Sequence, residues 1–261
     1  MNNVYMRFPG GVSKTLTLSY DDGCPDDMRL ISIMDRYGIK GTFNLNSVRL
    51  PGEEQMRLYT ESGMEIAVHG YRHLELNKLS EDEIWDEIVE DRKNLEKIVS
   101  QPVTGMAYAY GQCNENVVRT IRKAGIQYSR TVGRTMDFRL PTEWLLLDPT
   151  CHHDEPALPE LTERFLAAEP LEPMMFYVWG HAYEFPRKDN WHVMENFCEK
   201  IGGRTDIWYA TNIEIYRYVK AYEALVFSAE GTSVYNPGAQ DIWFAKDGDV
   251  FCVKGGETLA L

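Results

Sequence analysis

Two aspartates and two histidines in the first third of the chain have types and spacings that suit metal-assisted hydrolysis. Asp21 and Asp22 directly follow the β-like run 15–20, and His69 and His73 form an HxxxH pair after a second such run. Two imidazoles at this spacing lie close together on a helical turn or compact loop, and with a carboxylate they suit a divalent ion. A helix-capping turn and two solvent-facing histidines are the structural alternatives.

Two further motifs also stand where β-like runs end. The sequence YAYG (108–111) contains Tyr110, and His181 follows the apolar run 174–179. An aromatic cluster with a glycine turn and a buried structural histidine are the alternatives here. Because active sites of parallel β/α folds lie at the carboxyl ends of the strands, the motifs together predict one site more strongly than any of them alone.

Short β-like runs alternate with helical patterns over most of the chain, which predicts an α/β fold with a parallel sheet. The predicted strands are 15–20, 41–45, 64–68, 104–108, 127–130, 174–179 and 207–210. Helices are predicted over 26–37, near 56–59, after the capping box of Ser80 and Glu83, after Asn114, over 161–168, after Asn190 and from Asn212. Residues 131–156 are predicted to be rich in loops. No GxGxxG or P-loop follows the first strand, so a barrel is favoured over an open nucleotide-binding sheet.

The pattern changes near residue 224. The segments 241–246 and 249–254 flank Asp247 and Gly248, a dipeptide typical of a two-residue hairpin turn. We therefore predict a (β/α) barrel over residues 1–223 and a β-hairpin appendage over residues 224–261. The appendage is a candidate interface for a homo-oligomer.

Composition limits the partners and the compartment. The chain has 27 Lys and Arg against 40 Asp and Glu, a net charge of −13, which argues against binding nucleic-acid backbones. Its longest wholly apolar run, 174–179, is far shorter than the ~20 residues that span a bilayer, so we expect no membrane partner. The five cysteines form no CxxC pair, which is typical of free thiols, and the N-terminus shows no secretory signal. These features predict a cytoplasmic protein.

Four of the motifs carry a family resemblance. SYDDG (19–23), HGYRH (69–73), AYAYG (107–111) and the strand that ends at His181 resemble the ordered motifs of the polysaccharide deacetylases, carbohydrate esterase family four. The resemblance spans roughly residues 14–215. It implies a distorted (β/α) barrel, often with seven strands, in which a divalent metal, commonly zinc, serves to remove N- or O-acetyl groups from sugars.

The resemblance also implies roles for individual residues. Asp21 matches the general base, His181 the general acid, and the backbone N–H of Tyr110 the oxyanion donor. The residues that match the metal ligands are Asp22, His69 and His73. Zinc is the first choice for such a mixed nitrogen and oxygen site, although cobalt, nickel, manganese or iron also suit it.

Two motifs depart from the family pattern, and a third has several candidates. The third motif usually reads Arg-x-Pro-Tyr, but Ala107 and Ala109 replace the arginine and the proline. Arg130, at the end of a predicted strand, is our candidate to take over the arginine's role of orienting the base. The fifth motif is usually Leu-x-Leu-His and here reads VWGH (178–181). Candidates for the fourth motif are Asp137, Trp144 and CHHD (151–154). For CHHD we favour a polar loop over a partner of His181.

The sequence therefore predicts a metal-dependent hydrolase that removes an acetyl or other acyl group from an acylated sugar or related small substrate, without a covalent intermediate. Two histidines and one carboxylate also suit a non-haem iron oxygenase, although no site for an oxidisable co-substrate is evident. A catalytically silent carbohydrate-binding barrel that keeps the metal is another alternative, against which the intact Asp21 argues. A hydrolase of another non-peptide amide is the third. The lack of a signal points to a cytosolic acylated sugar, nucleotide sugar or small amide rather than cell-wall polymer.

Overall fold

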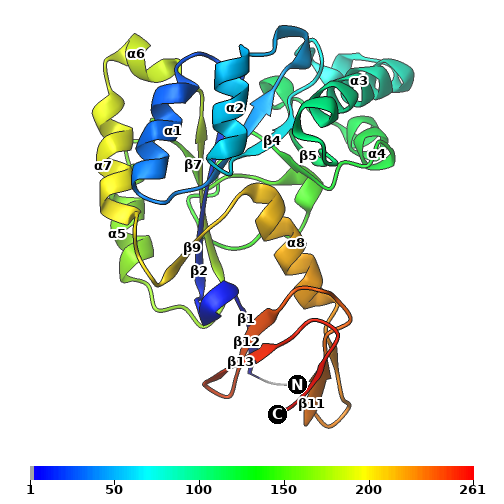
Figure 1. The fold of residues 1–261 in the computed structure, drawn as a ribbon, viewed down its shortest axis with the longest axis vertical. Coiled ribbons are helices and arrows are strands. Elements are labelled where there is room, and N and C mark those ends of the chain that lie inside the picture. Colours follow the sequence, from blue (N-terminus) through cyan, green and yellow to red (C-terminus); the bar gives the residue numbers. More distant parts are fainter. Residues whose placement is uncertain (1–2) are drawn as a thin grey trace.

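The computed structural model describes residues 3–261, and a curled parallel sheet forms its centre (Figure 1). The sheet has the strand order β6-β5-β4-β3-β2-β8-β7, and β9 also pairs with β2. Its strands are β2 (Lys14–Asp21), β3 (Gly41–Leu45), β4 (Glu65–Val68), β5 (Gly105–Ala107), β6 (Tyr128–Arg130), β7 (Cys151–His152), β8 (Met174–Gly180) and β9 (Ile207–Tyr209). One edge of β2 pairs with β8. Along the other edge, the first residues of β2 pair with β9 and the last residues pair with β3. With β6 and β7 at its two ends, the sheet is a half-barrel.

This architecture confirms the predicted α/β fold with a distorted barrel of about seven strands. The strands predicted between residues 15 and 210 are all present, and none of their ends moves by more than one residue. The strand β7 lies inside the stretch 131–156, for which the sequence predicts loops. A strand of two residues is too short to show a β period, which explains why it was not predicted.

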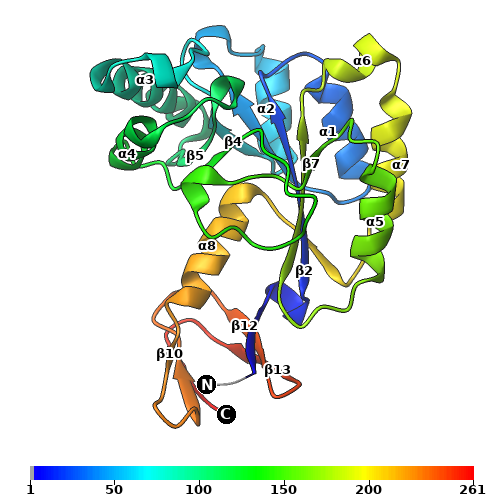
Figure 2. The same ribbon diagram turned by 180° about the vertical axis from the view of Figure 1, so that it is seen from behind.

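In the part of the chain that the structure describes, eight α-helices pack around the sheet, and Figures 1 and 2 show their arrangement. They are α1 (Asp27–Arg36), α2 (Glu53–Glu61), α3 (Glu81–Val99), α4 (Glu115–Lys123), α5 (Leu158–Ala167), α6 (Glu184–Lys188), α7 (Trp191–Ile201) and α8 (Asn212–Glu223). The predicted capping box is present at the start of α3, where Ser80 and Glu83 bond reciprocally. Asn114 caps α4 as predicted, by accepting a hydrogen bond from the Val117 amide at 2.9 Å. Asn190 precedes α7 as predicted, but its side-chain amide donates to Asp154 instead.

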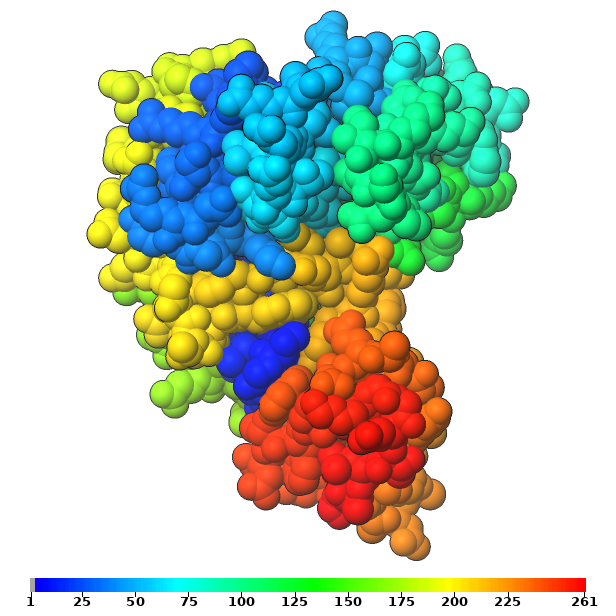
Figure 3. Space-filling view, in the orientation of Figure 1, coloured from blue at the N-terminus to red at the C-terminus, as the bar shows by residue number. Residues whose placement is uncertain are grey.

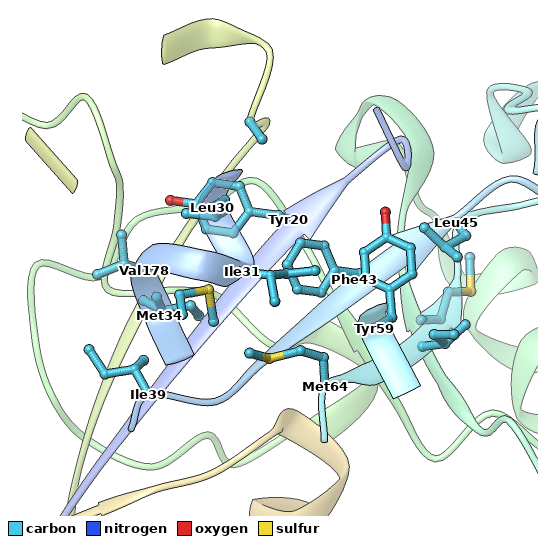
Figure 4. Close-up of a cluster of buried hydrophobic side chains, with 14 of the residues drawn as sticks. Tyr20, Leu30, Ile31, Met34, Ile39, Phe43, Leu45, Tyr59, Met64 and Val178 are labelled. Carbon is cyan, nitrogen blue, oxygen red and sulfur yellow. The ribbon is translucent and has the colours of Figure 1, made fainter. Parts of the chain in front are cut away.

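The main core lies between the sheet and the helices that cover it, and Figure 4 shows the part of this core beside α1 and α2. Every residue of β2 and β3 is buried, as expected for parallel strands whose two faces are covered. The rings of Phe43 and Tyr59 lie 4.8 Å apart between β3 and α2, and Leu30 and Ile31 of α1 are fully buried beside Tyr20. This packing fixes the ends of β2 and β3, from which the site residues extend.

The C-terminal strands form two small antiparallel sheets that project from the rest of the molecule (Figure 3). One contains β1 (Val4–Arg7), β12 (Ile242–Lys246) and β13 (Asp249–Val253), and the other β10 (Val226–Phe227), β11 (Ser233–Tyr235) and β14 (Thr258–Ala260). The predicted hairpin is confirmed, because Asp247 and Gly248 both have positive φ and connect β12 to β13. Since β1 pairs with β12, residues near both ends of the chain share one sheet. The boundary after residue 223 stays a prediction.

Two simpler expectations concern thiols and membranes. All five cysteines are free, as the sequence predicts. Within residues 3–261, no helix combines the length and the apolar character that crossing a bilayer requires.

Candidate active site at the carboxyl edge of the sheet

The carboxyl ends of β2, β4 and β8 bring four of the predicted site residues together. Asp21 is the last residue of β2 and Asp22 follows it, while His69 follows β4 and His181 follows β8. The Nε2 atom of His69 lies 3.7 Å from a carboxylate oxygen of each aspartate. The Nε2 atom of His181 lies 3.9 Å from Asp21 Oδ2 and 4.0 Å from Asp22 Oδ2. Two imidazoles therefore face the same pair of carboxylates.

Asp22, His69 and His73 have the chemistry and the spacing of a metal site. One potential ligand atom from each lies within 4.8 Å of the others, and His73 Nε2 is 3.5 Å from Asp22 Oδ1. The Nδ1–H group of His69 donates to the carbonyl oxygen of Ala107 at 2.9 Å, so the lone pair on Nε2 faces the aspartates. Such an outer hydrogen bond fixes the tautomer that a metal requires. Two imidazole nitrogens and one carboxylate fit a divalent ion and leave coordination positions open.

Three of the predicted site residues have an unusual backbone conformation. Asp22, His73 and Tyr110 have φ values of 76°, 58° and 56°, in the left-handed region that side-chain-bearing residues rarely adopt. Each such residue costs on the order of 1–3 kcal/mol and persists only where its surroundings hold it. The His73 ring packs edge-on against the Tyr110 ring, with centroids 4.5 Å apart. Tyr110 is thus brought next to the metal-ligand candidates, although its side chain is 58% exposed.

Asp21 is a buried carboxylate held by two partners from other strands. A guanidinium nitrogen of Arg130 contacts its Oδ2, and the side-chain amide of Asn44 donates to Oδ1 at 2.8 Å. Burial alone would raise the pKa of Asp21, but the charges of Arg130, His69 and His181 lower it to about 2. Asp21 is therefore ionised at neutral pH. Arg130 thus contacts Asp21 as expected, and its role in orienting a general base stays a prediction.

His181 is oriented by a residue that the sequence reasoning missed. Its Nδ1–H group donates to Glu184 Oε1 at 2.8 Å, which turns Nε2 towards the aspartates. Burial opposes protonation, but the hydrogen bond to Glu184 and the charges of Asp21 and Asp22 raise the pKa of His181 above its usual value. Glu184 starts the short helix α6, three residues after His181. The spacing of three residues between His181 and Glu184 was the one feature of the sequence that could have indicated this contact.

Two other residues missed in the sequence hold the loop that carries His69. The side-chain amide of Asn46 donates to the carbonyl oxygens of His69 and Gly70 at 3.0 and 2.7 Å. Asp91, on α3, accepts a hydrogen bond from the His69 amide at 3.1 Å. These bonds join the ends of β3 and β4 to α3, so His69 has a fixed position before any ligand binds.

The candidates for the fourth motif have different surroundings. Asp137 pairs with Arg139, and Trp144 packs against Tyr216 in a separate core cluster. The interpretation of CHHD (151–154) as a polar loop is wrong, because Cys151 and His152 form β7 and His153 is fully buried. These residues lie beside Glu184, since β7 pairs with β8, which leads to His181.

Residues 10–129, which include both aspartates and the HxxxH pair, match the family model described as "Polysaccharide deacetylase". Over these residues, a little less than half of its length, the chain is similar to the polysaccharide deacetylase family, carbohydrate esterase family four. "Putative polysaccharide deacetylase YxkH" of Bacillus subtilis (strain 168) is 27% identical over 124 residues, which cover 45% of this chain and 44% of that protein. The match therefore spans less than half of that relative.

Solved structures of the family show the same fold. The probable polysaccharide deacetylase from Pseudomonas aeruginosa PAO1 superposes with a TM-score of 0.62 at 17% identity, covering 80% of this chain and 92% of that chain. The family 4 carbohydrate esterase from Streptomyces lividans, in complex with acetate, gives a TM-score of 0.55 at 12% identity, covering 76% and 93%. At these identities the likeness establishes the half-barrel fold of the deacetylase domain and nothing finer.

Proposed function

We propose that this protein is a metal-dependent hydrolase that removes an acetyl or other acyl group from an N- or O-acylated carbohydrate. One observation carries the proposal. An ionised buried carboxylate, a cluster of potential metal ligands and a histidine of raised pKa face one another within 4.0 Å at one edge of the sheet. The similarity to the deacetylase family supports the same chemistry.

Asp22, His69 and His73 would hold the ion. When bound, a divalent metal polarises an acyl carbonyl and lowers the pKa of a water ligand from about 15.7 to about 7. Zinc suits this nitrogen and oxygen donor set, as do cobalt, nickel, manganese and iron. The His69 Nδ1–H bond to Ala107 supports this assignment because it leaves the lone pair of Nε2 free for a ligand bond.

Asp21 would accept the proton of the attacking water. Its ion pair with Arg130 and its hydrogen bond from Asn44 keep it ionised and leave it no proton of its own to donate. Those two contacts also fix the carboxylate in one orientation beside His69. Positioned general bases typically contribute roughly 10²- to 10⁴-fold to rate.

His181 would protonate the leaving amine or alkoxide from Nε2. Glu184 supports this role because it holds Nδ1–H and favours the charged imidazolium. The backbone N–H of Tyr110 would stabilise the oxyanion of the tetrahedral intermediate, a contribution of roughly 3–4 kcal/mol for a well-placed donor. Tyr110 is adjacent to the metal-ligand candidates through its contact with His73.

The substrate is proposed at the level of class. We infer an acylated carbohydrate that reaches the protein in the cytoplasm, because five free thiols suit a reducing compartment. The test is release of acetate from a panel of N- and O-acetylated sugars by the zinc-loaded protein. Activity should disappear after chelation and return with added zinc. Metal binding without hydrolysis of any panel member would contradict the proposal and favour the silent carbohydrate-binding barrel.

A further inference from the structure

A second cluster of potential metal ligands lies on the far side of His181 from the aspartates. One ligand atom from each of His152, His153, Asp154 and Glu184 lies within 4.8 Å of the others. The first three residues come from the end of β7 and the turn after it, and Glu184 starts α6. None of them is assigned to the first metal site or to catalysis, although Glu184 orients His181.

The separations within this cluster match a coordination shell. His153 Nε2 lies 3.2 Å from Glu184 Oε2 and 3.5 Å from Asp154 Oδ1. An ion with tetrahedral bonds of about 2.0–2.1 Å holds its ligand atoms about 3.3–3.4 Å apart. Both distances from His153 Nε2 are therefore close to the spacing of ligand atoms around one ion.

His153 is buried without a hydrogen-bond partner. Its side chain is 0% exposed, and within residues 3–261 neither of its ring nitrogens has an aligned partner, nor has Glu184 Oε2. A buried polar group left unpaired costs about 1–3 kcal/mol. An ion between Nε2 and Oε2 would remove this cost for those two atoms.

The fold leaves His153 one position. A Cβ atom on Gly180 would lie 2.0 Å from His153 Nδ1, so the glycine before His181 makes room for the ring. On the ring's faces, Phe185 stacks with centroids 4.2 Å apart and Tyr20 with centroids 5.8 Å apart. Nε2 of His153 therefore points at the two carboxylates without freedom to turn away.

Two further residues, His152 and Lys188, lie beside the proposed ligands without being ligands themselves. The Asp154 amide donates to His152 Nδ1 at 3.1 Å, so the proton of His152 is on Nε2, which lies 3.4 Å from Glu184 Oε2. His152 Nε2 therefore faces the carboxylate with a proton and offers no lone pair to the ion. Lys188, about half exposed, contacts Asp154 Oδ2 and lies 3.6 Å from Glu184 Oε2. In the absence of an ion, its ammonium group supplies positive charge to these two carboxylates. Because the side chain is about half exposed, it can move into solvent when an ion binds.

We propose that His153, Asp154 and Glu184 bind a second divalent transition-metal ion, of the zinc or manganese class. Glu184 joins this site to the catalytic one, because its Oε1 accepts from His181 Nδ1 while its Oε2 faces the second ion. A pocket of about 510 Å³ is lined by His153 and Asp154 and gives the ion a path from solvent. The inference does not depend on the proposed hydrolysis, since it concerns only metal binding.

The test is a metal titration of the full chain. Chelator-treated protein is titrated with Zn²⁺ alone against a chromophoric competitor, and two ions per chain are expected. The double variant Asp22→Asn/His73→Ala should keep one ion, held by the second site. In that background, Glu184→Gln should weaken the remaining site at least about 100-fold, since losing even an outer partner of a ligand costs about 10- to 100-fold. Zinc-edge anomalous diffraction would locate both ions.

Matched variants separate a lost ligand from a damaged fold. Glu155→Gln, in the same turn but paired with Arg134, should leave both ions bound. Lys188→Met should tighten the second site, because it removes the competing charge. Thermal unfolding of the apo proteins will identify a variant that fails to fold, and His153→Asn then serves as the second ligand variant. The proposal is overturned if wild type binds one ion that Asp22→Asn/His73→Ala abolishes, or if Lys188→Met weakens the second ion.

Discussion

Asp21 and Asp22 are adjacent in sequence and both face His69 and His181, but each has a further partner of its own. Asp21 ends β2 in a buried ion pair with Arg130, whereas the positive φ of Asp22 turns it towards His69 and His73. We predict that Asp22→Asn lowers zinc affinity sharply, because a charged ligand is lost. Asp21→Asn should keep the ion but lose turnover, roughly 10²- to 10⁴-fold, since an amide cannot accept a proton. Metal titration and acetate release on both variants measure the difference. Near-normal turnover by Asp21→Asn would show that Asp21 is not the base.

His181→Ala should lose roughly 10²- to 10⁴-fold in turnover while the zinc content of the catalytic site stays unchanged. The reason is that His181 Nε2 approaches the aspartates at 3.9–4.0 Å from a different strand than the metal-ligand candidates. His192→Ala, at an exposed position of α7, is the matched control and should behave as wild type. An unchanged rate on an amide substrate would make His181 a structural residue.

Arg130 is the largest fully buried side chain, and its charge is paired with Asp21 and stacked on Trp179 at 4.3 Å. Removing one partner of a buried pair leaves an uncompensated charge, so Arg130→Met should destabilise the protein by about 3–5 kcal/mol. The double variant Arg130→Met/Asp21→Asn should recover much of that loss because no charge stays buried. Urea unfolding measures both, and a double variant no more stable than Arg130→Met would contradict the pairing argument.

At the scale of elements, Glu65 joins four parts of the fold. It accepts hydrogen bonds from Thr42 of β3, Tyr128 of β6 and the Ile213 amide of α8 at 2.7–2.9 Å. Burial raises the pKa of Glu65 to about 7 despite these bonds. The folded protein therefore holds this proton more tightly than the unfolded chain does, whose glutamate pKa is about 4.3.

The sign of the pH effect follows from that difference. Stability from Glu65 is fully present below pH ~4.3 and is lost as pH rises towards 7 and beyond, where ionisation in the buried site is unfavourable. We expect the unfolding free energy of Glu65→Gln, relative to wild type, to rise between pH 5 and pH 8 in chelator-treated protein. Glu61→Gln, at an exposed position, should show no such trend. If the difference in unfolding free energy between Glu65→Gln and wild type stays constant from pH 5 to pH 8, the pKa of Glu65 is not raised into this range.

At the scale of the whole molecule, the first strand, β1, is part of the small sheet that β12 and β13 form near the C-terminus. β1 pairs along its length with β12, and Met6 is buried there. Deleting residues 1–7 should expose the edge of β12 and speed amide exchange in β12 and β13, while β2, β3 and β4 keep their protection. Hydrogen exchange with mass spectrometry measures both regions. Equal loss of protection in the parallel sheet would mean that the two regions unfold as one unit.

Local signals determined much of the site. The parallel strands appear in the sequence as short apolar runs, and every predicted strand end lies within one residue of the observed end. Because Asp21, Asp22, His69 and His181 stand at or just after such ends, the sequence alone predicted that they lie at one edge of the sheet. The order of the motifs also sufficed to identify the resemblance to the family. These features depend on neighbouring residues in the chain, and their spacing is visible without coordinates.

Only the tertiary structure decided the long-range partners. Arg130 and Asp21 are 109 residues apart, and their contact depends on how the half-barrel curls from β6 round to β2. Glu184 meets His153 because β7 pairs with β8, and β7 is too short to show a period in the sequence. The pairing of β1 with β12 likewise has no local signal. Sheet order and curvature arise from the packing of the whole chain, so they fix contacts that no segment specifies by itself.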